Sequence, residues 1–199
     1  MTIGIIGAGL IGTAFARRAV QAKIPAILSN SRDPESLAGL VSEIGGRVRA
    51  GTRSEAAAQD MVLLAVNWSK LPAALAGLPD FGGRVVIDAN NPIEPPTFQP
   101  ADLHGRLSTE VVIDHLPGAR IVKAFNHLPA KVLGEDPHVA GGRRVLFFAG
   151  ADPKAKADVA ALIEKLGFFG VDLGRINEGG RAINLPGGNL LTLNLVRLS

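Results

Sequence analysis

Six residues near the amino terminus, Gly7-Ala8-Gly9-Leu10-Ile11-Gly12, have the types and spacing of a phosphate-binding turn. They directly follow the apolar run Thr2–Ile6, and an amphipathic helix is expected to begin within them. In such a turn the first glycine permits the bend, the second lets backbone approach a pyrophosphate, and the third lets the helix pack on the strand. With 24 glycines in the chain the spacing alone is weak evidence. Its placement between a strand and a helix predicts dinucleotide binding, against the alternative of an ordinary glycine-rich turn.

The end of the second expected strand indicates which dinucleotide would bind. An NAD site carries Asp or Glu there, roughly 20 residues past the glycines, for the ribose 2′-hydroxyl. This chain has Ser29-Asn30-Ser31-Arg32 instead, and hydroxyls, an amide and a guanidinium suit a 2′-phosphate. Asp33 is interpreted as the cap of the next helix, with Pro34 at its first position. The sequence therefore predicts NADP(H); the alternative is a surface turn with an incidental arginine.

Polar residues also follow three later apolar runs. They are Asn67-Trp68 after 61–66, Asn90-Asn91 after 84–89, and Asn126-His127 after 121–125. The carboxyl ends of parallel strands meet at one edge of a sheet, where open α/β folds bind ligands. His127 is therefore the candidate catalytic residue, as a hydrogen-bond donor to a substrate carbonyl or flavin edge. The alternatives are an Asx turn before Pro92 and a packing role for Trp68.

Short apolar runs alternate with amphipathic segments along the chain, which is typical of βαβ units. The fold class predicted is α/β, a Rossmann-type doubly wound, mostly parallel sheet with extra C-terminal strands and helix. Thr52 and Glu55 match a capping box, Asp152-Pro153 matches a helix start, and Ser108 is interpreted as the cap of a helix through Leu116. Strands are expected at 2–6, 25–28, 48–50, 61–66, 84–89, 121–125, 144–149 and 168–173, and helices after Gly12 and at 34–44, 53–58, 72–78, 108–116 and 153–166.

At 199 residues the chain is expected to form a single NADP-binding Rossmann domain over 1–199. Residues 1–125 would be the dinucleotide-binding core and 126–199 a C-terminal partner-binding extension. The tail from Leu190 to Leu198 is apolar, and we expect it to be helical and to pack on the core or against a second subunit. The second possibility favours a homodimer.

Composition excludes several classes of protein. The absence of Cys excludes disulfide scaffolds, zinc ribbons, iron–sulfur clusters and cysteine nucleophiles, and the absence of Tyr excludes a tyrosine-dependent short-chain dehydrogenase. A net charge of +3 and a single Trp argue against nucleic acid. His104, His115 and His138 lack metal-ligand spacing, so no metal site is expected. With neither a signal peptide nor a spanning segment, we expect a cytoplasmic protein without membrane contact, with Lys70 and Lys123 as surface charges.

Four segments together resemble a known family: Gly7–Gly12, Asn30–Arg32, Asp88–Pro92 and Lys123–His127. They are similar to the deazaflavin (coenzyme F-420)-dependent NADP oxidoreductases, whose fold also forms the NADPH-binding domain of six-transmembrane ferric reductases. The resemblance covers most of the chain and is firmest over its first half. It implies a redox enzyme in which hydride moves directly between nicotinamide and a flavin-like ring, so that the cofactors carry the chemistry.

The resemblance also implies roles for individual positions. The pyrophosphate would be held by Gly7, Ala8, Gly9, Leu10, Ile11 and Gly12, and the 2′-phosphate by Asn30, Ser31 and Arg32. The adenosine or pyrophosphate side would be lined by Val66, Asn67 and Trp68. The nicotinamide ribose or carboxamide would be reached by Asn90 and Asn91, and the nicotinamide face by Ala124, Asn126 and His127. Some members of the family add a basic residue shortly after the arginine, where this chain has Asp33–Ser36, which implies a weaker preference for NADP.

Three functions remain open from the sequence. The first is an NADPH-dependent oxidoreductase with a small-molecule redox partner, with FMN, FAD or 5-deazaflavin as second cofactor or substrate. The second is a reductase of a small carbonyl or imine, although such enzymes usually append a helical domain of about 100 residues. The third is a non-catalytic NADP sensor or interaction protein.

Overall fold

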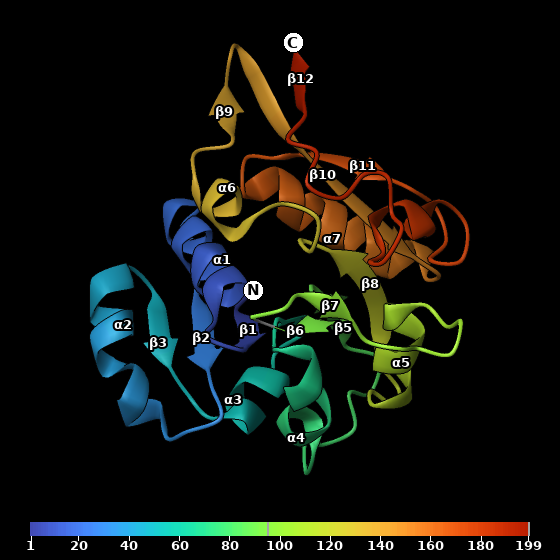
Figure 1. Cartoon of the computed structure of the whole chain (residues 1–199). Helices are drawn as coiled ribbons and strands as arrows, with labels where there is room; N and C mark the ends of the chain where they lie inside the picture. The colour runs from blue at the N-terminus through green and yellow to red at the C-terminus, as the bar shows by residue number, and fades with distance from the viewer. Residues whose placement is uncertain (95, 199) are drawn as a thin grey trace.

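Ten strands form one sheet among the residues that the structure, a computed structural model, describes, which are 1–94 and 96–198. Hydrogen-bonded neighbours follow the order β11-β10-β8-β5-β4-β1-β2-β3, and β9 and β12 pair with β10 beside this path (Figure 1). The bounds are β1 (Ile3–Ile6), β2 (Ala26–Ser29), β3 (Val48–Ala50), β4 (Met61–Leu64), β5 (Val85–Asp88), β8 (Arg120–Ala124), β9 (His138–Val139), β10 (Gly142–Gly150), β11 (Phe169–Asp172) and β12 (Val196–Leu198). A separate hairpin consists of β6 (Ile93–Glu94) and β7 (Gln99–Pro100).

The six strands from β3 to β8 are parallel, and β10 then runs antiparallel to β8. The chain passes from β1 outward to β2 and β3 and returns on the other side of β1 as β4, so the strand order reverses between β1 and β4. In open α/β sheets, ligands bind beyond the carboxyl ends of the strands at such a reversal. The predicted fold class is confirmed, and it locates the expected ligand crevice.

Helices cover both faces of the sheet (Figure 1). One buried cluster joins α1, α2 and α7 to the sheet around Phe15, Phe125 and Leu162; the other joins α3, α4 and α5 to it around Leu71 and Val112. The bounds are α1 (Leu10–Gln21), α2 (Ala38–Ile44), α3 (Arg53–Ala57), α4 (Leu71–Leu75), α5 (Ser108–Asp114), α6 (Ala130–Gly134) and α7 (Pro153–Lys165). Short 3-10 turns span Pro34–Leu37, Trp68–Lys70 and Gly179–Ile183.

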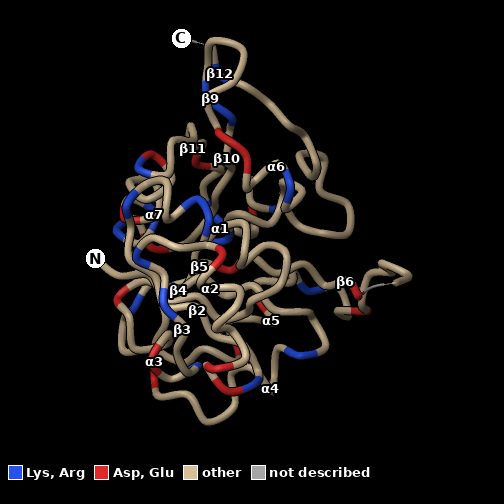
Figure 2. The backbone as a smooth tube through the Cα atoms, turned by 90° about the vertical axis from the view of Figure 1, so that its left-hand side faces the viewer, with Lys and Arg blue, Asp and Glu red and all other residues tan. Residues whose placement is uncertain are grey.

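The prediction of a helix in the apolar tail is wrong. Residues 189–195 form turns and extended chain, and β12 pairs antiparallel with the start of β10, with Val196 opposite Arg144. The first half of β10 extends past the sheet and offers unpaired backbone groups, which β9 and β12 satisfy. The three strands form an arm that projects at the carboxyl-terminal end of the molecule in both views (Figures 1 and 2).

Two predicted helix caps differ in detail. Asp33 precedes the 3-10 turn with Pro34 at its first position, but its side chain makes no capping bond; its carbonyl oxygen accepts from Ser36 instead. Ser108 is the first residue of α5 rather than its cap, and its hydroxyl donates to Asn184. The capping box of Thr52 and Glu55 and the Asp152 cap of α7 are both confirmed.

Candidate cofactor-binding site

The glycine loop lies at the reversal of strand order, between β1 and α1. Gly7 has a φ of 113°, and a Cβ there would lie 2.0 Å from the carbonyl oxygen of Ala65. A Cβ on Gly12 would lie 1.9 Å from the carbonyl oxygen of Gly7. A Cβ on Gly9, by contrast, would meet no atom within 4 Å. The fold itself therefore requires glycine at positions 7 and 12, whereas position 9 leaves room for a group from outside the chain.

The first turn of α1 fits a phosphate. Gly9 occupies the N-cap position, and no side chain caps the helix or places a carboxylate in its first turn. The amino-terminal N–H groups of this 12-residue helix are thus open to an anion, and the helix dipole favours negative charge there. The loop fits the pyrophosphate of a dinucleotide on this ground.

A cleft of about 630 Å³ begins at the glycine loop, and eight of the predicted cofactor-binding residues line it. From the predicted set it is lined by Gly7, Ala8, Gly9, Asn30, Ser31, Arg32, Val66 and Asn67. Its charged lining residues are Arg32, Arg53 and Lys70, and no carboxylate lines it. An anionic ligand is therefore favoured throughout this cleft.

The turn after β2 is ordered by Asn30. The Oδ1 atom of Asn30 accepts from the Arg32 backbone N–H at 2.8 Å, and its Nδ2 donates to the Ser36 hydroxyl at 2.9 Å. Within the described part of the chain, the Ser31 hydroxyl and the Arg32 guanidinium have no partner, and both residues are exposed. Asn30 thus shapes the turn, and Ser31 and Arg32 keep free donors for a ligand.

The opposite end of the groove, beyond β5 and β8, holds a buried polar network. Lys123 and Asp88 are opposite each other in the sheet and are both fully buried. The Lys123 Nζ donates to Asp88 Oδ2 at 3.1 Å, to the Asn90 carbonyl oxygen at 2.5 Å and to the Ser108 hydroxyl at 3.3 Å. Burial lowers the pKa of Lys123, and the Asp88 carboxylate opposes this. The expectation of a surface lysine at position 123 is wrong. Lys123 is the last-but-one residue of the central strand β8, and its side chain is buried beside Asp88 of the neighbouring strand β5.

Both polar atoms of the Asn90 side chain make hydrogen bonds within the protein. Its Oδ1 accepts from the Val66 backbone N–H at 2.8 Å, and its Nδ2 donates to Asp88 Oδ1 at 2.9 Å. The residue is 2% exposed. Asn90 therefore joins the loops after β4 and β5, and its burial keeps the amide away from a ligand in the cleft.

Asn91 and Asn126 also bind each other. Asn91 Nδ2 donates to the Asn126 carbonyl oxygen at 2.9 Å, and Asn126 Nδ2 donates to Asn91 Oδ1 at 3.0 Å and to the Ile183 carbonyl oxygen at 2.7 Å. Ala124 has its side chain in the core. The residues predicted to bind the nicotinamide are thus close together. Their hydrogen bonds mostly hold neighbouring loops to one another, so that Asn90, Asn91 and Asn126 form a bracket between these loops.

His127 lies under the C-terminal segment. It is 1% exposed, and its ring stacks at a tilt on Phe147 with centroids 5.1 Å apart. Neither ring nitrogen has a hydrogen-bond partner among the described residues. Burial lowers the pKa of His127 to about 4, against a smaller opposing effect of the Val145 backbone. The imidazole is therefore neutral at physiological pH and covered, and its catalytic role stays a prediction that needs the covering segment to move.

Other predicted residues lie outside the cleft. Leu10 begins α1 and is 83% exposed, and Ile11 is half-buried against the core. Trp68 packs partly buried against the cluster around Leu71, as its alternative interpretation holds. Sequence reasoning missed Ser36, Arg53 and Lys70 as cleft residues. For Arg53 the available signal was its place at the start of a capping-box helix, directly after a strand on the same sheet edge.

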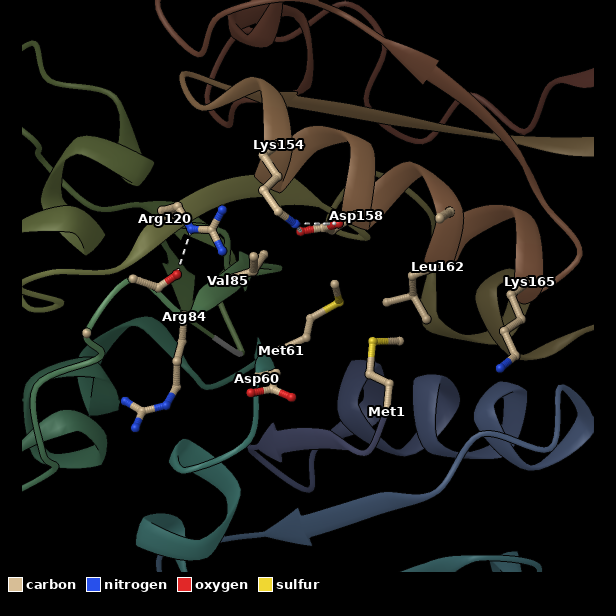
Figure 3. Close-up of a pocket in the computed structure, with 13 residues that line it drawn as sticks. Met1, Asp60, Met61, Arg84, Val85, Arg120, Lys154, Asp158, Leu162 and Lys165 are labelled. Atoms are coloured by element: carbon tan, nitrogen blue, oxygen red, sulfur yellow. Dashed lines mark hydrogen bonds and ion pairs between the residues drawn. The ribbon is translucent and has the colours of Figure 1, made fainter.

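A second cavity, of about 580 Å³, lies at the opposite, amino-terminal edge of the sheet (Figure 3). Met61 and Val85, which begin β4 and β5, line it, and Lys154 points to its ion-pair partner Asp158. Arg120 bonds to the Gly83 carbonyl oxygen and pairs with Asp152. This second cavity is remote from the carboxyl ends of the strands, where the predicted cofactor-binding residues lie.

Two further features bear on ligands and partners. Over residues 1–94 and 96–198, no group of three or more His, Asp or Glu side chains is arranged to hold a metal ion. In the same described part of the chain, no helix has the length and apolarity to cross a membrane. Basic and acidic residues are interspersed along the backbone (Figure 2).

The glycine loop at the strand reversal, the open helix N-terminus and the cationic cleft define a dinucleotide-binding Rossmann protein. Residues 2–92 match the family described as "NADP oxidoreductase coenzyme F420-dependent", and over these residues the chain belongs to that family. The predicted family is thereby confirmed, and NADP(H) is the dinucleotide that the family uses.

Three similar proteins extend this finding beyond residue 92. A crystal structure of the hypothetical protein SMa0349 from Sinorhizobium meliloti is 46% identical, with a TM-score of 0.93 over 99% of this chain and 96% of that one. A putative F420-dependent NADP-reductase from Arthrobacter sp. FB24 is 28% identical, with a TM-score of 0.72 over 89% and 86%. Metalloreductase STEAP3 of Rattus norvegicus is 26% identical over 92% of this chain, which spans only 36% of that protein.

Proposed function

We propose that this protein is an NADPH-dependent oxidoreductase that moves hydride between nicotinamide and a flavin or deazaflavin-type partner. The observation that carries the proposal is the cleft beside the glycine loop, whose charged lining is entirely cationic. Membership of the NADP oxidoreductase family supports it, as does the similarity to a putative F420-dependent NADP-reductase.

The residues of this chain act by binding and orienting. Gly7 and Gly9 would bring backbone N–H groups and the α1 terminus to the pyrophosphate, and Ser31 and Arg32 would bind the 2′-phosphate. The bracket of Asn90, Asn91 and Asn126 would fix the loops around the nicotinamide end. Bound NADPH would supply the hydride, and no side-chain acid is needed for a transfer between two rings.

Two exposed apolar side chains support a flat partner. Leu10 follows the glycine loop and is 83% exposed, and Phe98, at the tip of the β6–β7 hairpin, is 61% exposed. Both belong to connections that leave the carboxyl edge of the parallel strands. Large apolar groups left in water at a ligand edge are typical of a surface that a ring will cover.

A second candidate function is a non-catalytic NADP sensor. The observation in its favour is the burial of His127, Asn90 and Asn126, which are 1%, 2% and 6% exposed and so offer little accessible polar surface to a second substrate. A carbonyl or imine reductase would need a proton donor at this end, and of the three candidate functions the arrangement supports this one least.

Self-association belongs to the same proposal. We propose a homodimer formed through the arm, because Leu193, Leu195 and Leu198 are exposed there although the predicted helix is absent. Sedimentation at several concentrations tests it: a single monomeric species at every concentration would contradict it. A cytoplasmic location and a role of residues 126–199 in partner binding likewise stay proposals.

The first experiment measures NADPH oxidation by the purified protein with FMN, FAD, riboflavin, a ferric chelate and a 5-deazaflavin offered in parallel, and NADH as the control reductant. We expect turnover with one of the flavin-type acceptors and its loss in Arg32→Glu. Arg47→Glu is the matched control and should keep full activity. Arg47 is exposed, lies outside the cleft, and its side chain has no partner among the described residues. Tight NADPH binding without turnover on any acceptor would favour the sensor instead.

A further inference from the structure

We propose that Arg53 is a second specificity-determining residue, which binds the 2′-phosphate of NADP(H) together with Ser31 and Arg32. The proposal rests on the proposed function only through NADP(H) binding and does not depend on the redox partner. It assigns a contact to a residue from a different βα unit, since Arg53 begins α3 whereas Ser31 and Arg32 follow β2.

Two cavities meet at this point of the surface. The cleft from the glycine loop adjoins an outer cavity of about 820 Å³, lined by residues 30–36 and 52–54. The residues that line both are Asn30, Ser31, Arg32, Ser36 and Arg53. A group that branches from the ribose of a nucleotide in the cleft would point into the outer cavity between these residues.

The shared residues are suited to a phosphate. Two of the five are arginines, two carry hydroxyls, and none is acidic. Asp33 and Glu35 line only the outer cavity and not the cleft. Both arginines of the outer cavity thus lie at the junction with the cleft, where a 2′-phosphate differs from the 2′-hydroxyl of NAD(H).

Arg53 is held in position without its charge being neutralised. Its Nη1 donates to the carbonyl oxygens of Ala73 and Ala74, at 2.6 and 2.8 Å. The capping box of Thr52 and Glu55 fixes the start of α3, on which Arg53 is the first residue. Within the described residues no carboxylate pairs with Arg53, and its Nη2 and Nε make no hydrogen bond. A half-buried guanidinium anchored by one nitrogen keeps its other donors for a charge-assisted bidentate contact.

The position of Arg53 also bears on the basic residue that some members of the family carry shortly after the arginine and that this chain lacks. The turn after Arg32 continues as Asp33-Pro34-Glu35-Ser36, which implied a weak preference for NADP. Arg53 supplies a second positive charge to the same cavity from α3, so we expect the preference for NADP(H) over NAD(H) to be strong.

The test measures dissociation constants of wild type and Arg53→Gln for two ligand pairs that differ only in the 2′-phosphate: NADPH with NADH, and 2′,5′-ADP with 5′-AMP. Glutamine keeps a donor for the Ala73 carbonyl and removes the charge. We expect the discrimination within each pair to fall by about tenfold or more, because a charge-assisted bond is lost. Arg47→Gln, an exposed arginine outside both cavities, is the control and should discriminate like wild type.

The opposite outcomes are distinct. Unchanged discrimination in Arg53→Gln, or equal weakening of both ligands of a pair, would overturn the assignment of Arg53. Wild-type protein that binds none of the four ligands would instead contradict NADP(H) binding itself. Should Arg53→Gln fail to fold, the Nε–Hε resonance of Arg53 in wild type, assigned with Arg53→Lys, gives the answer: it should shift with 2′,5′-ADP and not with 5′-AMP.

Discussion

The two ends of the predicted cofactor groove differ in how their polar side chains are used. At the adenosine end, the side chains of Ser31 and Arg32 have no partner among the described residues and face a cleft without carboxylates. At the nicotinamide end, Lys123, Asp88 and Asn90 bond to one another and are buried. Residues of similar polarity therefore serve recognition at one end and architecture at the other.

The difference has a physical cause. An exposed guanidinium costs little without a partner, because water solvates it until a ligand arrives. A buried lysine has no such alternative, and each of its donors must find an acceptor within the fold. Changes at the adenosine end should therefore alter binding without harming the fold, and changes at the nicotinamide end should do the reverse.

The largest effect is expected from Lys123→Met. It leaves the Asp88 carboxylate buried without its cation, which should lower the free energy of unfolding by about 3–5 kcal/mol or prevent folding. Urea denaturation measures this. Lys131→Met, an exposed lysine on α6, is the control and should stay within about 0.5 kcal/mol of wild type. A stable Lys123→Met protein would break the comparison at its architectural end.

The next effect concerns pH and His127. Its pKa is about 4 in the folded protein, below the ordinary value of 6.5, so the unfolded chain binds a proton in that window and the folded one does not. Stability should therefore fall as pH drops, by about 2.5 kcal/mol between about pH 7.5 and about pH 4.5 from this residue. In His127→Phe, which preserves the stack on Phe147, that part of the acid destabilisation should disappear, as urea denaturation at both pH values will measure. His115→Gln, at an exposed histidine, should retain the wild-type pH dependence.

A smaller effect separates two glycines of one loop. Gly9→Ala places a methyl group in open space, so the melting temperature should be unchanged while NADPH binds about tenfold more weakly, or about 1.4 kcal/mol. Gly12→Ala would meet the Gly7 carbonyl oxygen at 1.9 Å and should destabilise the protein itself. Thermal melts and NADPH titrations of both variants make the comparison. Normal NADPH binding by Gly9→Ala would refute the placement of the pyrophosphate.

The smallest effect is expected from Lys70→Gln. Lys70 lines the cleft but not the outer cavity, so its charge should act on the dinucleotide as a whole. NADPH and NADH should both bind about two- to threefold more weakly, with unchanged discrimination, because an exposed charge contributes little. Titrations with both cofactors measure this. A selective loss of NADPH affinity would move the 2′-phosphate site toward Lys70.

Much of the fold could be predicted because local patterns and tertiary packing agree. The parallel strands, the glycine loop and two capped helices each have a signature within a few neighbouring residues. The tail and Lys123 lacked such a signature. Whether Leu190–Leu198 forms a helix or a strand depends on the free edge of β10, and whether Lys123 is exposed depends on Asp88 in the neighbouring strand.

The sequence by itself determined the parallel sheet, the phosphate turn and the family, because each depends on residues close together along the chain. Only the tertiary structure decided which polar groups remain free. Asn90, Asn126 and His127 look like ligand residues in a sequence, yet each is held by a residue far along the chain: Asn90 by Val66, Asn126 by Ile183 and His127 by Thr192. Arg53, which the capping box places at the start of a helix but does not mark as a ligand residue, reaches the cleft because α3 packs beside the turn after β2. Burial and hydrogen bonding are properties of the whole fold, and together they separate a binding residue from a structural one here.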